Sequence, residues 1–256
     1  LSLHDALPIL DGLGESDLSS VEGVTTYNLN EVDGYSQLLA SAQDVWFMAL
    51  GPLTNVAASI QRQPALWQHV SRLIIMGGAY KTNGNTSPVA EYNFWVDPDA
   101  ADYVLQNSPI MIELVPLDVT RKIVMTPNIL QMMQYINPEK SEFVTKIIQF
   151  YFDFHWQQEH VLGAVINDPL VVFYALHPKL SRQLTTFMTV VTSGIALGQS
   201  IVDIADFWHE KPNAILLQEI DARAAMAFII ARLLNISLER AMEELDNIAT
   251  DLECLS

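Results

Sequence analysis

Glu91 and Asn93 form a carboxylate–amide pair whose residue types suit the recognition of hydroxyl groups. Two residues apart in an extended segment, their side chains point to the same side. The carboxylate can accept a hydrogen bond from one hydroxyl while the amide donates to another. Spacing alone favours a simpler interpretation, in which the pair belongs to a solvated loop. The place of the pair in the fold therefore decides between ligand binding and an ordinary polar loop.

A strand–helix–strand unit precedes this pair. Residues 45–50 and 73–76 are short apolar runs that end at glycine, as is typical of buried strands in a parallel sheet. Residues 55–63, between them, have a helical character and stop before a proline. Ligands of such sheets bind beyond the carboxyl ends of the strands, so the polar segment after Met76 should face a site.

The alternation of strands and helices continues toward the end of the chain. Further strands are predicted at residues 110–115, 186–192 and 214–218. Further helices are predicted at residues 98–109, 138–160, 222–234 and 238–252. The pattern predicts an α/β fold with a mostly parallel sheet flanked by helices.

Helix starts are marked by a capping residue followed by proline at Asp97, Thr126 and Asn137. Residues 118–120 are predicted as a turn. In the long predicted helix at 138–160, four apolar residues fall at helical spacing: Phe143, Ile147, Tyr151 and Phe154.

Composition sets outer limits on function. The chain of 256 residues is half hydrophobic and 17% charged, which predicts one globular domain with a sizeable core. A net charge of −17 argues against nucleic acid as a partner, because phosphate binding needs clustered Lys and Arg. No apolar run reaches the about 18 residues that span a bilayer, so no membrane association is expected. The single cysteine, Cys254, excludes an internal disulfide framework and predicts a reducing, cytoplasmic compartment.

Seven short motifs follow one another along the chain: GPLTN at 51–55, MGG at 76–78, AEYN at 90–93, DPDAA at 97–101, PLDVT at 116–120, INDPL at 166–170 and GQSIVD at 198–203. Together they resemble the inosine–uridine nucleoside hydrolase family, whose members cleave the N-glycosidic bond of ribonucleosides with the help of bound calcium. The resemblance extends over nearly the whole chain from Asp11 onward. It implies the Rossmann-like fold of that family and a small-molecule ribonucleoside as substrate.

The resemblance also implies roles for individual residues. Glu91 and Asn93 would hold the ribose and its 5′ end, and Met76, otherwise an ordinary core residue at a strand end, would border it. Asp168, otherwise an ordinary helix N-cap before proline, would bind calcium together with the backbone carbonyl of Leu50. These groups are expected to converge on one cleft at the carboxyl edge of the sheet. A calcium-bound water would attack the sugar through an oxocarbenium-like state.

Asn167 departs from the family pattern, since some members carry histidine immediately before the metal-binding aspartate. Asparagine has no titratable proton near neutral pH, so it is expected to bind substrate by hydrogen bonding and not to act as a general acid. His155 and His160, in the long predicted helix, are alternative acids, although a histidine on an aromatic-rich helix more often serves packing.

The start of the chain differs from the family. Residues 1–9 are interpreted as a non-native leader, and residues 10–256 as a nucleoside hydrolase domain without its first two βα units. The water-activating aspartate and further metal ligands are expected in that preceding segment, so this fragment is predicted to be inactive alone. The full-length protein is expected to be a homo-oligomer. The alternative is a non-catalytic nucleoside- or sugar-binding protein, or a decayed paralogue.

Overall fold

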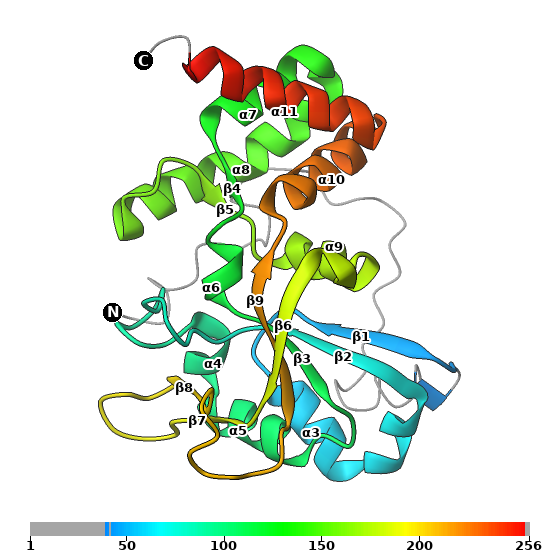
Figure 1. Cartoon of the computed structure of the whole chain (residues 1–256), viewed down its shortest axis with the longest axis vertical. Helices are drawn as coiled ribbons and strands as arrows, with labels where there is room; N and C mark the ends of the chain where they lie inside the picture. Colours follow the sequence, from blue (N-terminus) through cyan, green and yellow to red (C-terminus); the bar gives the residue numbers. More distant parts are fainter. Residues whose placement is uncertain (1–38, 41, 254–256) are drawn as a thin grey trace. The chain divides into compact units, whose positions relative to one another are not determined.

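The computed structural model describes residues 39–40 and 42–253, with the backbone alone for 249–253 (Figure 1). The interpreted leader at residues 1–9, Asp11, where the resemblance begins, and Cys254 lie outside these ranges. The described chain forms two compact units. One contains residues 42–120 and 174–220 and holds the main sheet, and the other contains residues 121–173 and 221–253. Of the described helices, none is long and apolar enough to cross a membrane.

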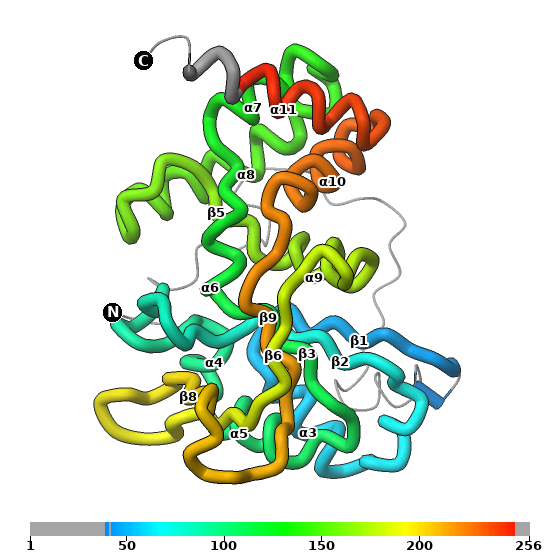
Figure 2. The backbone as a smooth tube through the Cα atoms, in the orientation of Figure 1, coloured from blue at the N-terminus to red at the C-terminus, as the bar shows by residue number. Residues whose placement is uncertain are grey.

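Five strands of the described chain form the main sheet, in the order β1 (Val45–Ala49), β2 (Val70–Met76), β3 (Ile112–Val115), β9 (Ala214–Ile220) and β6 (Ser181–Thr186). The first four are parallel, with Leu73 opposite Ile112 and Ile112 opposite Ala214. The strand β6 runs antiparallel to β9, and the two lie side by side in Figure 2. The predicted mostly parallel sheet is confirmed, and the three apolar runs nearest the start of the chain are neighbours in it.

A layer of helices packs against the side chains of this sheet. It includes α3 (Thr54–Arg62), the 3-10 helix η1 (Pro64–His69) and α5 (Pro98–Asn107). The buried cluster that they share with the strands contains Trp67, Leu73, Ile75, Phe94, Val104 and Leu114. Burial of such apolar side chains contributes most of the stability of the sheet unit, at roughly 1.5–3 kcal/mol for each large side chain.

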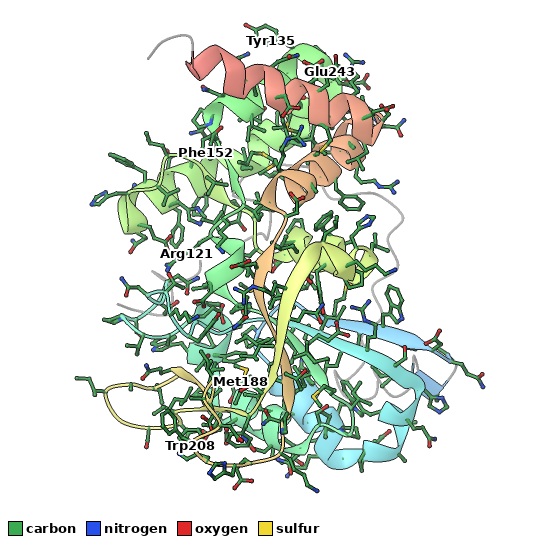
Figure 3. The ribbon with its side chains drawn as sticks, viewed as in Figure 1. Arg121, Tyr135, Phe152, Met188, Trp208 and Glu243 are labelled. Carbon is green, nitrogen blue, oxygen red and sulfur yellow. The ribbon has the colours of Figure 1, made fainter. Side chains whose placement is uncertain are left out.

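The predicted strand at residues 186–192 is partly wrong. Thr186 ends β6, and Met188 begins β7 (Met188–Val190), which pairs with β8 (Ser200–Val202) in a separate two-stranded sheet. The side chain of Met188 is buried, whereas Trp208, on the loop after β8, is half exposed (Figure 3). The strand β6 is mostly polar, so no apolar run predicted it. It lies at the edge of the sheet and is stabilised by backbone pairing with β9.

The second unit is mainly helical within its described residues. Its helices are α7 (Pro127–Ile136), α8 (Pro138–Glu159), α10 (Ala222–Leu234) and α11 (Leu238–Glu253), accompanied by the short strands β4 (Val124–Met125) and β5 (Ala164–Val165). The predicted bounds of the last three helices agree with the structure to within one residue. The buried positions of α8 are Ser141, Val144, Ile148 and His155, whereas Phe143 is exposed. Apolar residues surround much of this helix, so periodicity did not single out the face that packs.

Four further short elements belong to the described chain. Helix α9 (Asp168–Leu176) is followed by the 3-10 helix η2 (Pro178–Leu180). After β3, the predicted turn at 118–120 is instead the one-turn helix α6 (Leu117–Thr120). Between β2 and α5 lies the short helix α4 (Tyr92–Val96). The predicted caps are confirmed, since the side chains of Asp97, Thr126 and Asn137 each accept a hydrogen bond from a backbone N–H in the first turn.

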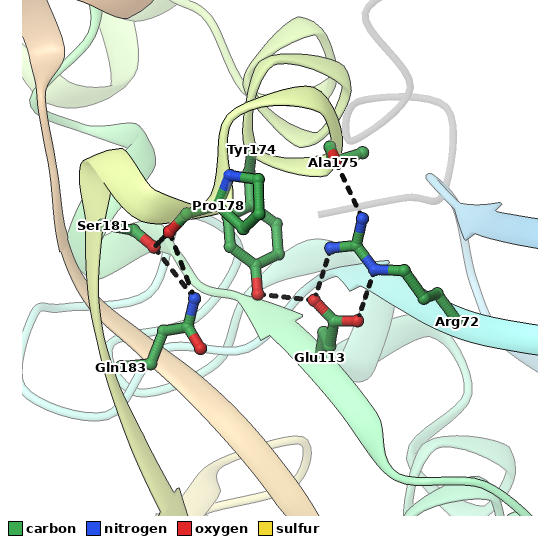
Figure 4. Close-up of polar contacts among 7 residues, drawn as sticks. All are labelled: Arg72, Glu113, Tyr174, Ala175, Pro178, Ser181 and Gln183. Atoms are coloured by element: carbon green, nitrogen blue, oxygen red, sulfur yellow. Dashed lines mark hydrogen bonds and ion pairs between the residues drawn. The ribbon is translucent and has the colours of Figure 1, made fainter.

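A polar network ties the end of α9 to the sheet (Figure 4). Arg72 of β2 forms two 2.7 Å hydrogen bonds with the carboxylate of Glu113 on β3, and its third nitrogen donates to the carbonyl oxygen of Ala175. The hydroxyl of Tyr174 donates to the same carboxylate. Burial, with the adjacent Glu113 carboxylate, raises the pKa of Tyr174 above its ordinary value. Each of the three guanidinium nitrogens of Arg72 thus has an oxygen acceptor. The guanidinium carbon also lies 4.7 Å from the centroid of the Trp46 ring, in a cation–π contact.

Candidate functional site

Asn93 links the carboxyl ends of β1 and β2. Its amide nitrogen donates to the backbone oxygen of Met76 at 3.0 Å and approaches the Met76 sulfur at 3.5 Å. The same nitrogen lies 3.5 Å from the carbonyl oxygen of Leu50, directly after β1. Three of the predicted site residues are thus brought together at the edge of the sheet where parallel α/β proteins bind ligands.

Glu91 is buried beside Asn93 and acts as the N-cap of α4. One carboxylate oxygen accepts from the backbone N–H of Asn93 at 2.9 Å. The other accepts from Gly78 at 3.0 Å and from Phe94 at 3.3 Å. These N–H groups offset the cost of burying the charge. The solvated-loop interpretation of the pair is therefore wrong.

The local backbone also differs from the extended segment predicted for this pair. Glu91 is extended, but α4 begins at the next residue, so Asn93 is helical. The side chains are close because the carboxylate caps the N–H groups that the first turn of a helix leaves unpaired. A glutamate directly before an aromatic-rich stretch does not by itself predict such a short helix, and periodicity cannot detect a single turn.

The glycine pair after Met76 allows β2 to end in close contact with its neighbours. A Cβ atom at Gly77 would lie 2.6 Å from the ring of Phe94. At Gly78, where φ is +78°, a Cβ atom would lie 2.6 Å from the hydroxyl oxygen of Ser200. Glycine at these two positions therefore permits a close backbone approach that a side chain would prevent.

Asn85 is a polar residue near the site to which the sequence assigned no role of its own. Its side-chain oxygen accepts from the backbone N–H of Tyr92 at 2.9 Å, and its own N–H donates to the carbonyl oxygen of Ala90. The loop that carries it is compact, since a Cβ atom at Gly84 would lie 2.2 Å from the Ala90 oxygen. The sequence feature that could have indicated a role for Asn85 is its position directly after Gly84, in the polar loop that follows β2.

Asn167 and Asp168 belong to the other unit and are described separately. Helix α9 begins at Asp168, as the sequence predicted. Burial raises the pKa of the Asp168 carboxyl to about 6, although part of the residue remains exposed, and its negative charge contributes to a raised pKa of Tyr151 on α8. The side-chain oxygen of Asn167 is buried and has no hydrogen-bond partner among the described residues. The expected convergence of Asp168 with Glu91 and Asn93 stays a prediction.

The two histidines of α8 make structural contacts. His155 is buried, and its Nδ1 donates to the carbonyl oxygen of Tyr151 at 2.8 Å. Its ring also packs edge-on against Phe154. His160 ends the helix in a left-handed conformation, with its ring against Trp156. These contacts match the packing role that the sequence favoured over an acid role.

Acidic, histidine and cysteine side chains do not gather in groups of three or more anywhere in the described ranges. The predicted calcium ligands, the Leu50 carbonyl and the Asp168 carboxylate, are both oxygen donors, which is the ligand type that calcium prefers. Together they fit part of the six to eight oxygens of a calcium shell.

The fold places the chain in the class of α/β proteins that contains the nucleoside hydrolases. A plant nucleoside hydrolase superposes with a TM-score of 0.80 at 25% identity, over 88% of this chain and 73% of that one. A purine-preferring ribonucleoside hydrolase from Gardnerella vaginalis gives a TM-score of 0.77 at 24% identity, over 87% and 71% of the two chains. These structures establish the shared architecture.

Sequence comparison places the chain within this class. It is 29% identical to a probable uridine nucleosidase 2 of Arabidopsis thaliana over 91% of this chain and 74% of the relative. It is 32% identical to a pyrimidine-specific ribonucleoside hydrolase of Salmonella typhi over 77% of this chain and 63% of the relative. The family model of inosine-uridine preferring nucleoside hydrolase matches residues 6–227. The chain therefore belongs to this family, and it spans about two thirds to three quarters of the length of these two relatives.

Proposed function

We propose that this protein hydrolyses the N-glycosidic bond of ribonucleosides, releasing ribose and the free base. Family membership supports this activity. The observation in the structure that carries it is the position of the Asn93 amide, which lies between the ends of β1 and β2 beside the buried Glu91 carboxylate. A fixed amide and a fixed carboxylate at the carboxyl edge of a parallel sheet suit the vicinal hydroxyls of a ribose.

Glu91 and Asn93 would act by orientation. Backbone N–H groups hold the carboxylate in place, and the bond to Met76 holds the amide. Neither side chain must give up much rotamer freedom when a sugar binds, so more of the interaction energy is available for positioning the anomeric carbon. Met76 would contribute an apolar border to the ribose.

Members of the family are generally metal-dependent. We propose calcium as the ion, with the Leu50 carbonyl and the Asp168 carboxylate as two of its oxygen ligands. When bound, the ion would supply Lewis acidity that lowers the pKa of a water molecule. The residues of this chain would then keep the sugar oriented, and Asp168 would bind the ion in its deprotonated form.

Asn167 would contact the nucleobase or the sugar. Its buried side-chain oxygen lacks a hydrogen-bond partner within the described chain, which is costly unless a ligand or water donates to it. Because an amide cannot release a proton, the group that protonates the leaving base must be another one. This residue is also the observation that favours the second candidate function, a nucleoside- or sugar-binding protein without turnover.

Base release from a panel of purine and pyrimidine ribonucleosides distinguishes the two functions. The protein is expressed from its complete reading frame and assayed with calcium and with a chelator. Hydrolysis that requires calcium is the expected result. Ribonucleoside binding by the calcium-loaded protein without release of base would contradict the hydrolase proposal and support the binding protein.

A further inference from the structure

The loop after β2 is held by a carboxylate from the segment that follows β3, the neighbouring strand of the sheet. Asp118, in α6 directly after β3, accepts hydrogen bonds from successive backbone N–H groups. One oxygen accepts from Tyr80 at 3.0 Å, and the other accepts from Lys81 at 2.9 Å and from Thr82 at 3.0 Å. Three consecutive N–H groups that converge on one anion form a nest, which favours negative charge.

A backbone bond reinforces this connection. The N–H of Leu117 donates to the carbonyl oxygen of Gly78 at 2.9 Å, so the chain after β3 is joined to the chain after β2 at two adjacent places. Both connections lie immediately beyond the strand ends at which Met76 and Asn93 meet. Asp118 and the candidate site therefore lie at the same edge of the sheet.

The segment that Asp118 holds leads directly into the site. Residues 80–82 continue to Asn85, whose side-chain oxygen accepts from the backbone N–H of Tyr92, next to Asn93. The loop is therefore anchored at its start by Asp118 and at its end by α4. Lys81, at the first anchor, and Asn83, between the two anchors, are exposed, so apolar burial contributes little to the order of this part of the loop.

We propose that Asp118 is a positioning residue, which holds residues 79–85 in the conformation that presents the polar loop to the sugar of a bound ribonucleoside. The inference rests on the proposed function for its ligand, but the order of the loop is measurable without any ligand. Loss of the carboxylate would leave three N–H groups without their charged acceptor and would allow the loop to sample other conformations. A ligand would then have to order the loop on binding, which lowers its affinity.

The first test is hydrogen exchange of the backbone amides. In the wild-type protein, the amides of Tyr80, Lys81 and Thr82 should be protected although they lie outside any helix or strand. In Asp118→Asn, an NH2 group replaces one acceptor oxygen, and exchange at residues 80–82 should accelerate at least about 10-fold, the scale of losing a charge-assisted hydrogen bond. Unprotected wild-type amides at these residues would overturn the proposal, and this measurement requires no variant to fold.

Asp203→Asn is the matched control. The Asp203 carboxylate also accepts from two successive backbone N–H groups, those of Phe207 and Trp208, both at 2.8 Å. The control substitution also removes one negative charge from a carboxylate that accepts hydrogen bonds from successive backbone N–H groups, but in a different loop. It should accelerate exchange at residues 207–208 and leave residues 80–82 unchanged. Acceleration at residues 80–82 in the control would show general loosening and would overturn a specific role for Asp118.

The second test separates a positioning role from a purely structural one. With uridine and inosine as substrates, Asp118→Asn should raise KM about 10-fold, whereas Asp203→Asn should change it less than about twofold. An unchanged KM, despite faster exchange in the loop, would make Asp118 a structural residue only and overturn the proposal. If the wild-type protein hydrolyses no ribonucleoside, the proposed activity fails. The affinity for uridine, measured by calorimetry, then replaces KM with the same expected change.

Discussion

The side-chain amide nitrogen of Asn93 lies 3.0 Å from the backbone oxygen of Met76, to which it donates a hydrogen bond. This contact connects the short helix α4 to the carboxyl end of the strand β2. It also gives Asn93 two possible roles, as a structural link and as a ribose ligand. The two roles predict different ratios between the loss of stability and the loss of activity.

Asn93→Ala should lower kcat/KM for ribonucleosides by at least about 100-fold while the protein remains folded. The lost hydrogen bond leaves the Met76 oxygen unsatisfied, which costs roughly 1–3 kcal/mol of stability. Steady-state kinetics and a thermal melt measure both effects. Asn107→Ala is the control, because its side chain also donates to a backbone oxygen, that of Tyr103 at 2.9 Å, but on an exposed helix end. Equal activity in the two variants would contradict a ribose-binding role for Asn93.

Asp168→Asn should raise the thermal stability of the protein in chelator at neutral pH. Burial raises the pKa of this carboxyl to about 6 from an ordinary value near 4, so the folded state binds the proton more tightly than the unfolded state. The resulting destabilisation is absent below pH about 4, develops as the pH rises to about 6, and persists above it. Melting curves of both proteins at pH 4, 6 and 8 should therefore diverge as the pH increases.

Added calcium should reverse the order of the melting temperatures of the wild-type protein and Asp168→Asn. A ligand that binds only the folded state stabilises it in proportion to the logarithm of its concentration over Kd. The wild-type melting temperature at pH 8 should rise with added calcium, and that of Asp168→Asn should rise less. An equal rise in both proteins would remove Asp168 from the set of calcium ligands.

Gly78→Ala should destabilise the sheet unit by roughly 1–3 kcal/mol, because it combines a positive φ with a Cβ atom 2.6 Å from the Ser200 oxygen. Gly194→Ala isolates the effect of the positive φ. Gly194 has nearly the same φ, +80°, but a Cβ atom there would meet nothing within 4 Å. Urea denaturation should show the larger loss for Gly78→Ala. Similar losses would mean that the structure near Ser200 relaxes to accept the methyl group.

Arg72→Ala should cost roughly 3 kcal/mol, because it leaves the buried Glu113 carboxylate without its cation. The side chains of this pair are 18% and 12% exposed. In the comparable pair Arg182–Glu219, they are 59% and 56% exposed, so Arg182→Ala should cost less than about 1 kcal/mol. Urea denaturation of the two variants compares them directly. A similar cost for both would show that solvent screens the Arg72 network as effectively as a surface pair.

The sequence by itself determined those features that depend on local patterns. Apolar runs identified the parallel strands β1, β2 and β3, since the strands of a helix-covered parallel sheet are rich in apolar residues. Capping residues before proline identified the starts of α5, α7 and α8, because the cap and the helix it stabilises are adjacent in the chain. Motifs of several residues identified the family, and with it the candidate residues Glu91, Asn93 and Asp168.

Only the tertiary structure decided how these residues are held. The strand β6 is polar and is stabilised by pairing with β9, which no local pattern encodes. Glu91 is a helix cap that also binds the N–H of Gly78, thirteen residues earlier. Asp118 lies 38 residues from Tyr80, yet it holds the loop beside the site. The physical reason is common to all three: a backbone N–H or C=O group is the same at every residue, so its partner is chosen by the fold that brings the two together.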